Sequence, residues 1–243
     1  MIALLFAACT LEPSDTVMIG AVYSAHTDGV PVANATVETR NEMGEPLAIA
    51  TTDNDGMFEV QLPSTQMFFV TVSGDDYVPT SYAGIAGTDA LLLNEGELWL
   101  RSETKLDNIR QEFSDCDGFD TAGGVIEGEV RLLVVLQDDL ESLPLVTTAL
   151  LVAYDSNGIA HSACYLPEDE DPGGDTKETE ESNAQVTGST GRFAFFGVPA
   201  GPTDIEIQYD FGGSEPVSSW HYVYVPEEGT VPMYPALVNL PGP

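Results

Sequence analysis

Residues 51–60 read Thr-Thr-Asp-Asn-Asp-Gly-Met-Phe-Glu-Val, and this stretch decides the fold that the sequence predicts. Alternating residues lead into residues 53–56 (Asp-Asn-Asp-Gly), and residues 57–60 lead out of them. An Asp-Gly step between two alternating runs predicts a β-hairpin, because glycine accepts the positive φ that such turns need. The same pattern returns at residues 187–196 as Thr-Gly-Ser-Thr-Gly-Arg-Phe-Ala-Phe-Phe. The sequence therefore predicts an internal repeat of β structure.

The repeat extends outward from this turn. Residues 17–22 (Val-Met-Ile-Gly-Ala-Val) match residues 125–130 (Val-Ile-Glu-Gly-Glu-Val), with glycine in the same place. Residues 31–39 are echoed in the same way by residues 144–154. The second copy is longer, and most of its extra length is residues 167–183, which are strongly acidic and hold almost nothing apolar. We expect a mobile loop there, because such a stretch buries too little apolar surface to order itself.

The period of the apolar residues changes between the two halves. Leu106, Ile109 and Phe113 are spaced as on one face of a helix, and Ser102 or Thr104 is available as its N-cap. The sequence therefore predicts a short helix that packs through this stripe and joins the halves.

The complete pattern predicts an all-β protein, and its 23 glycines and 16 prolines suit a loop-rich β fold. We expect two tandem Ig/transthyretin-like antiparallel β-sandwiches, since a chain of 243 residues is long enough for two domains of about 100 residues. The first covers residues 17–101 and the second residues 124–243, with the acidic loop inside it. Residues 102–123 form the helical linker.

The two halves share strand starts, turns and the repeated glycine turn. These features are Gly20, Val22, 31–37, 52–58, Asp76 and Tyr77 in the first half, and Gly128, Val130, Pro144, Ala149, 187–193 and 198–201 in the second. On these residues each half resembles the carboxypeptidase regulatory-like domain, a seven-stranded β-sandwich of the transthyretin type. Domains of that family usually act as accessory or adhesive modules, so the resemblance implies no catalytic residues.

The charge balance excludes several classes of partner. Seven Lys and Arg residues face 40 Asp and Glu residues, which gives a net charge of −33 at pH 7. Nucleic acid is excluded as a partner, because its phosphates would be repelled. Docking on anionic lipid through a basic patch is excluded for the same reason. The charge favours solubility first and a cationic partner second.

Residues 1–8 are apolar and end in two alanines before Cys9. This leader resembles the signal peptide of a bacterial lipoprotein, in which small residues precede a lipidated cysteine. A secretory signal has a basic region before an apolar stretch of about 7–15 residues, so we expect this signal peptide to begin upstream of residue 1. The alternative is a buried N-terminal strand.

The lipoprotein resemblance implies lipidation at Cys9, followed by a polar tether over residues 9–16. Thr10 is not the aspartate that retains many lipoproteins at the inner membrane, so we expect anchoring in the outer membrane of a bacterial envelope. Lipid would be the only contact with the membrane.

Export would leave Cys116 and Cys164 as the remaining pair among three cysteines. Thiols oxidise outside the cytoplasm, so these two are candidates for a disulfide. Such a bridge would stabilise the fold by about 4 kcal/mol on the chain-entropy estimate.

Four aspartates are the candidates for a metal site: Asp53, Asp55, Asp75 and Asp76. They lie on turns, and Ca²⁺ favours six to eight oxygens of this kind. The spacing does not fit an EF-hand, because Ser64 stands where its twelfth-position glutamate would be. Aspartate is also a turn residue in its own right, which favours a purely structural role and no cofactor.

Residues 191–201 resemble the Gly-Arg-Phe-x-Phe…Pro-x-Gly run of intradiol ring-cleaving dioxygenases, which hold Fe(III) with two tyrosines and a His-x-His pair. Residues 220–224 read Trp-His-Tyr-Val-Tyr, with valine where the second histidine would stand. Strand alternation puts His221 on the face opposite to its aromatic neighbours. His26 and His161 lie on turns elsewhere. The ligand set is incomplete, and a metal site is defined by its ligands.

We therefore expect a non-enzymatic lipoprotein of the envelope surface that acts as a binding or structural module. Its partner would be an envelope or extracellular protein or a glycan. The alternatives are a Ca²⁺-linked adhesive module and a degenerate intradiol-dioxygenase-like enzyme.

Overall fold

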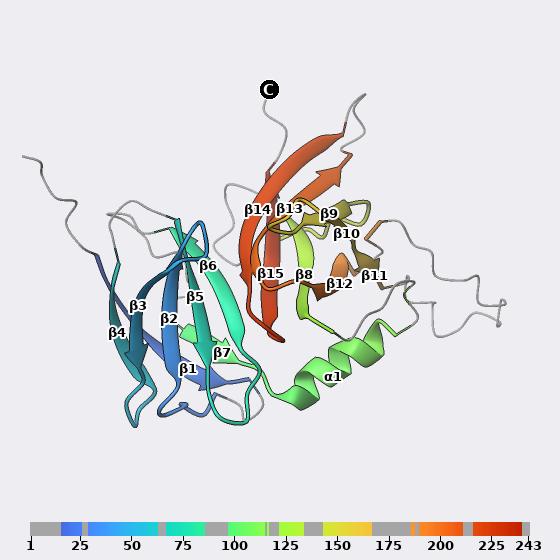
Figure 1. Cartoon of the computed structure of the whole chain (residues 1–243). Coiled ribbons are helices and arrows are strands. Elements are labelled where there is room, and N and C mark those ends of the chain that lie inside the picture. Colours follow the sequence, from blue (N-terminus) through green and yellow to red (C-terminus); the bar gives the residue numbers. More distant parts are fainter. Residues whose placement is uncertain are drawn as a thin grey trace, which may run out of the picture.

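The computed structural model describes residues 16–25, 29–62, 67–85, 97–114, 116, 122–133, 143–166, 186–187, 190–210 and 216–239. Within them the chain is all-β apart from one helix, as predicted (Figure 1). Cys9, the tether, His26 and the acidic stretch 167–183 lie outside the described residues.

The first half forms a sandwich of seven strands. Three of them make one sheet in the order β4-β1-β7, and the others make the facing layer in the order β6-β5-β2-β3. Alternating apolar residues from both layers fill the space between them, including Met18, Val37, Phe58 and Phe68. The strands are β1 (Thr16–Ser24), β2 (Thr36–Asn41), β3 (Pro46–Thr51), β4 (Met57–Leu62), β5 (Met67–Ser73), β6 (Thr80–Ile85) and β7 (Glu97–Leu100).

The second half repeats this strand order. One layer runs β12-β8-β15 with the short β11 at its edge, and the other runs β10-β9-β13-β14. A second core lies between these layers and includes Ile126, Leu151, Phe193 and Ile205. The strands are β8 (Gly124–Leu133), β9 (Leu150–Tyr154), β10 (Ala160–Ser162), β11 (Cys164–Tyr165), β12 (Arg192–Val198), β13 (Gly201–Tyr209), β14 (Val217–Val225) and β15 (Thr230–Asn239).

The sandwiches are not wholly antiparallel. In both copies the first strand pairs in parallel with the last strand of its sheet, β1 with β7 and β8 with β15. A third parallel contact joins β15 to β6 through Thr230 and Thr80. This contact makes one eight-stranded sheet that runs through both halves, so the two cores share a layer.

The turn at residues 53–56 is not the hairpin that its sequence predicts. The Asp53 carbonyl accepts from Gly56 N, and the Asp53 amide donates to Met57 O, so the turn itself is closed as expected. Yet β3 belongs to one layer and β4 to the facing layer. The turn therefore carries the chain across the sandwich, because the residues that close a turn do not determine whether the flanking strands pair.

A buried threonine beside each glycine turn explains why the motif repeats. Thr52 Oγ1 accepts from Ala35 N at 2.9 Å and donates to Val32 O at 2.7 Å. Thr187 Oγ1 makes the same pair of bonds to Ala149 N at 3.0 Å and Val146 O at 2.6 Å. Both threonines are buried, so the two hydroxyls satisfy backbone groups that water cannot reach.

The predicted helix is confirmed as α1 (Glu103–Glu112). Ser102 is its N-cap, and its Oγ accepts from Lys105 N at 3.2 Å. The stripe of Leu106, Ile109 and Phe113 is buried in a third cluster that contains Val78 from the first half and, from the second, Val125 and Phe196. Figure 1 shows α1 beneath the second sandwich, so this cluster ties the halves together.

Candidate binding cavity between the two sandwiches

A cavity of about 420 Å³ opens where the two halves meet. This size is within the range of small-molecule sites, roughly 300–1,000 Å³. It is bounded by β6, β7 and the start of α1 on one side and by β14 and β15 on the other. The lining residues are Ala25, Tyr82, Ala83, Glu97, Trp99, Arg101, Lys105, His221, Tyr222, Val223, Val231, Pro232, Met233 and Tyr234.

The wall from the first sandwich is made by Tyr82 and Trp99, which are held rigidly. Tyr82 Oη donates to Trp99 O at 2.6 Å and accepts from Trp99 N at 2.9 Å. Because Tyr82 is on β6 and Trp99 on β7, these bonds bridge the two layers of the sandwich. Tyr23 packs against the indole with ring centroids 5.4 Å apart. Burial raises the pKa of Tyr82 to about 12, so this phenol stays neutral and keeps donating.

The opposite wall is made by two tyrosines that are partly open to solvent. Tyr222 on β14 is 47% exposed and Tyr234 on β15 is 43% exposed. Exposed aromatic rings in a concave site are typical of binding surfaces, because they offer a flat apolar face together with a polar tip.

A buried ion pair closes the junction beside the cavity. Arg101, at the end of β7, pairs with Glu127 on β8, and their side chains are 11% and 2% exposed. The Tyr234 hydroxyl donates to the second oxygen of Glu127, and the Arg101 guanidinium lies over the Tyr234 ring, 5.9 Å from its centroid. Burial lowers the pKa of Arg101, and its Glu127 partner offsets the cost of holding both charges out of water.

His221 lines the cavity on the side of the second sandwich. Its position confirms the predicted alternation, since Val223 and Val225 on the same face are buried while Trp220 and Tyr222 are exposed. Burial lowers the pKa of His221, which favours a neutral imidazole. Among the described residues Nε2 has no hydrogen-bond partner. That nitrogen is itself buried, and the ring hydrogen-bonds the Leu237 backbone, so His221 belongs to the wall and offers no accessible polar atom to a ligand.

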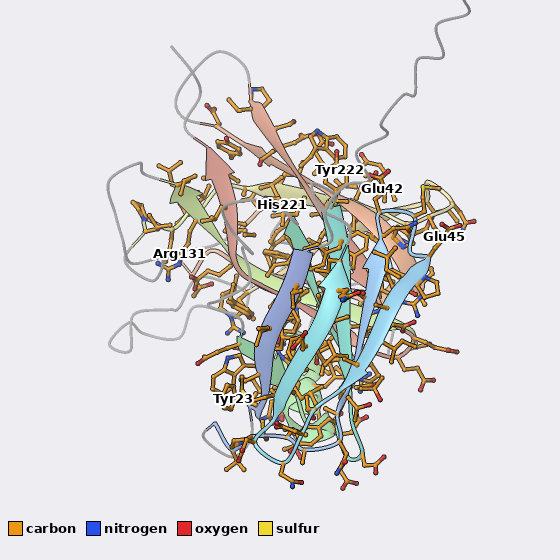
Figure 2. The ribbon with its side chains drawn as sticks, turned by 90° about the vertical axis from the view of Figure 1, so that its left-hand side faces the viewer. Tyr23, Glu42, Glu45, Arg131, His221 and Tyr222 are labelled. Atoms are coloured by element: carbon orange, nitrogen blue, oxygen red, sulfur yellow. The ribbon has the colours of Figure 1, made fainter. Side chains whose placement is uncertain are left out.

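The relative position of the halves is held by further contacts outside the cavity lining. The Tyr224 ring packs against Phe69, with centroids 6.0 Å apart, and under the Arg40 guanidinium at 4.8 Å. Gly44, in the β2–β3 turn, lies against Tyr224 and Pro202. Figure 2 shows this turn, with Glu42 and Glu45, beside the strand that holds His221 and Tyr222. These contacts join elements that are far apart in the sequence.

The four candidate aspartates lie at one end of the first sandwich, because Thr36 pairs with both Thr51 and Ser73. Asp53 Oδ1 accepts from Asp55 N and Met57 N, each at 2.9 Å, and so closes its own turn. In the part of the chain that the structure describes, no group of three or more His, Cys, Asp or Glu side chains is placed to hold a metal ion.

The two cysteines of the predicted disulfide meet in one region. Cys164 belongs to the apolar cluster under α1, and the half-buried Cys116 packs against that cluster. The bridge between them stays a prediction, as does lipidation at Cys9.

Of the histidines weighed for an iron site, the two that the structure describes are not brought together. His161 is on β10 and His221 on β14, the two edge strands of one four-stranded sheet. His161 is instead 3.3 Å from Asp155, a turn residue. The cavity itself was missed by sequence reasoning, and the aromatic run 220–224 was its only visible signal. No helix in the described ranges is long and apolar enough to span a membrane.

No protein-family model and no curated protein matches the chain. Among solved structures, the Bacillus anthracis TIE protein is 12% identical with a TM-score of 0.31, over 93% of this chain and 34% of that one. The chain thus spans 34% of that structure's length. The major pilin subunit of Bacillus cereus is 10% identical with a TM-score of 0.32, over 93% and 99% of the two chains. The shaft pilin SpaA of Lactobacillus rhamnosus GG is 9% identical with a TM-score of 0.28, over 95% and 99%. Similarities this low bear on neither activity nor partners.

Proposed function

We propose that this chain is a non-enzymatic binding module of the bacterial envelope surface, and that it binds its partner in the cavity between its two sandwiches. The observation that supports this most is the cavity's construction. Aromatic rings from both halves line a space of about 420 Å³ at a junction that a buried ion pair holds in place. Preformed walls bind well because little conformational freedom is lost on binding.

Three titratable groups at the junction support contact rather than catalysis. Arg101 and Glu127 are paired with each other, and the Tyr82 hydroxyl is bonded to the Trp99 backbone. General acid–base chemistry needs a group that can exchange a proton with the substrate near neutral pH. These three groups are already committed to holding the junction.

Location at the envelope rests on residues 1–8 and Cys9. Cys9→Ser should move the protein from the membrane fraction to the soluble fraction, because a lipid chain would be its only anchor. Retention of the Cys9→Ser variant in the membrane fraction would refute the anchor and leave the cavity's role untouched.

The proposed function does not include calcium, and Asp53 Oδ1 accepts two backbone hydrogen bonds within its own turn. The melting temperature of the full chain should be the same with and without Ca²⁺. A rise of several degrees would support the Ca²⁺-linked adhesive alternative, since a ligand that binds only the folded state raises stability.

Site-specific photo-crosslinking tests the binding site. A photoreactive residue replaces Tyr222, inside the cavity, or Trp220, two residues away and outside the lining. In the native envelope we expect a discrete adduct from position 222 and none from position 220. Equal adducts from both positions, or none from 222, would contradict binding in the cavity.

A further inference from the structure

We infer that the ligand of this cavity is a neutral saccharide, whose sugar rings pack on Trp99 and Tyr222. This inference rests on the proposed function and names the class of molecule that the site takes. It is carried by the shape of the walls, the balance of charge and the polar groups at the rim.

An aromatic ring from each sandwich lines the space. Trp99 comes from the first sandwich and Tyr222 from the second, and both line the cavity. The face of an aromatic ring is electron-rich, so it attracts the polarised C–H bonds that project from one face of a pyranose ring. A site with rings on both sides suits a ligand with two such faces.

The charges that line the cavity cancel. Glu97 opposes Lys105, and Arg101 is neutralised by its ion pair with Glu127. The chain as a whole carries −33, so its field repels an anionic ligand before contact. A cationic ligand would be drawn to the chain, but the cavity lining has no excess of negative charge to hold it. A neutral ligand meets neither obstacle.

The polar side chains that line the cavity can hydrogen-bond the hydroxyl groups of a saccharide. Glu97 and Lys105 are exposed and line the cavity. Together they offer hydrogen-bond donors and acceptors to the sugar hydroxyls, which can themselves both donate and accept. A purely apolar ligand would cover these two charged groups without pairing them, which disfavours it.

The two tryptophans allow a direct test, because Trp99 lines the cavity and Trp220 does not. In Trp220→Phe the emission reports on Trp99 alone, and in Trp99→Phe it reports on Trp220, which stacks on Tyr154 outside the site. Each variant is titrated with maltotriose, N,N′,N″-triacetylchitotriose and galactobiose as neutral probes and with trigalacturonate as the acidic probe.

We expect a saturable change of Trp99 emission with at least one neutral probe and no change of Trp220 emission. Adding Tyr222→Ser to Trp220→Phe should weaken that binding at least tenfold. Tyr222 is half exposed, so its replacement leaves the core intact, and an unchanged melting temperature verifies this.

Three results would overturn the saccharide inference. They are no response to any neutral probe, tighter binding of trigalacturonate than of every neutral probe, or an equal response from Trp220. If the crosslink at position 222 persists in these cases, the binding function stands and only the ligand class fails. If that crosslink is also absent, both fail.

Discussion

Two threonines, Thr52 and Thr187, support the fold by the same pair of hydrogen bonds. Thr52→Val and Thr187→Val should each lower the free energy of unfolding by about 1–3 kcal/mol, because each leaves a buried backbone donor and acceptor unpaired. Thr51→Val is the matched control, since Thr51 is exposed, and it should change stability by less than about 0.5 kcal/mol. Urea unfolding measures all three. A loss in only one copy would contradict the equivalence of the two halves.

Alanine substitutions at two glycines distinguish the cost of backbone strain from the cost of side-chain crowding. Gly56 and Gly158 have nearly the same φ, +75° and +74°, but a Cβ on Gly56 would lie 2.8 Å from Val22 O whereas Gly158 has open space. Alanine at either position incurs the left-handed penalty of about 1–2 kcal/mol. Gly56→Ala should therefore destabilise clearly more than Gly158→Ala in urea unfolding. Equal losses would show that the crowding beside Gly56 is relieved by small shifts.

At the scale of single residues, the local features that the sequence predicted were confirmed. The glycine turns and the helix cap at Ser102 are local features, and each follows from a few adjacent residues. The Arg101–Glu127 pair could not be predicted. Its partners are 26 positions apart in the sequence (127 − 101), and they meet only after the halves dock.

Among the elements, the turn between β9 and β10 is predicted to respond to pH. Hydrogen bonds from the Ile159 amide, then from Asn157 and His161, hold the pKa of Asp155 below its ordinary value of 3.8. A lowered folded-state pKa stabilises the fold above the unfolded value, and that contribution disappears as the pH falls through the folded value. The free energy of unfolding of the native chain should therefore exceed that of Asp155→Asn by its full amount at about pH 5. This excess should become smaller as the pH falls below 3.8.

Urea unfolding between pH 7 and pH 3 measures this difference. Asp204→Asn, at an exposed position on β13, corrects for the loss of one acidic residue from the net charge. A difference that stays constant down to pH 3 would contradict the role assigned to the Asp155 carboxylate.

Element type was predictable where alternation or helical spacing was strong, as in β14 and α1. Element pairing was not. The residues around Gly56 close a turn in either arrangement, so they cannot tell a hairpin from a crossing between facing sheets. The parallel pairing of β1 with β7 is equally invisible, since it joins the two ends of the first half.

In the whole molecule, the buried pair of Arg101 and Glu127 is predicted to lock the halves together. Glu127→Leu should lower the free energy of unfolding by about 3–5 kcal/mol, because it leaves a charge buried without its partner. Adding Arg101→Met should recover most of that loss. The exposed pair Asp107 and Arg110 is the control, and Asp107→Leu should change stability by less than about 1 kcal/mol. A double variant as unstable as Glu127→Leu alone would contradict this role.

The cavity was beyond sequence reasoning for a physical reason. Trp99, His221 and Tyr234 come from three different strands, and no motif links them. Only the docking of the sandwiches through β6, β15 and α1 creates the space between them.

The central claim is that the two sandwiches are one body, which is what makes the cavity a preformed site. Urea unfolding followed by tryptophan emission tests this most directly, because Trp99 reports on the first half and Trp220 on the second. In both Trp220→Phe and Trp99→Phe, the emission and circular-dichroism transitions should coincide at a single midpoint, as for cooperative unfolding. An emission transition that separates from the circular-dichroism transition in either variant would show two halves that unfold independently, and would contradict the claim.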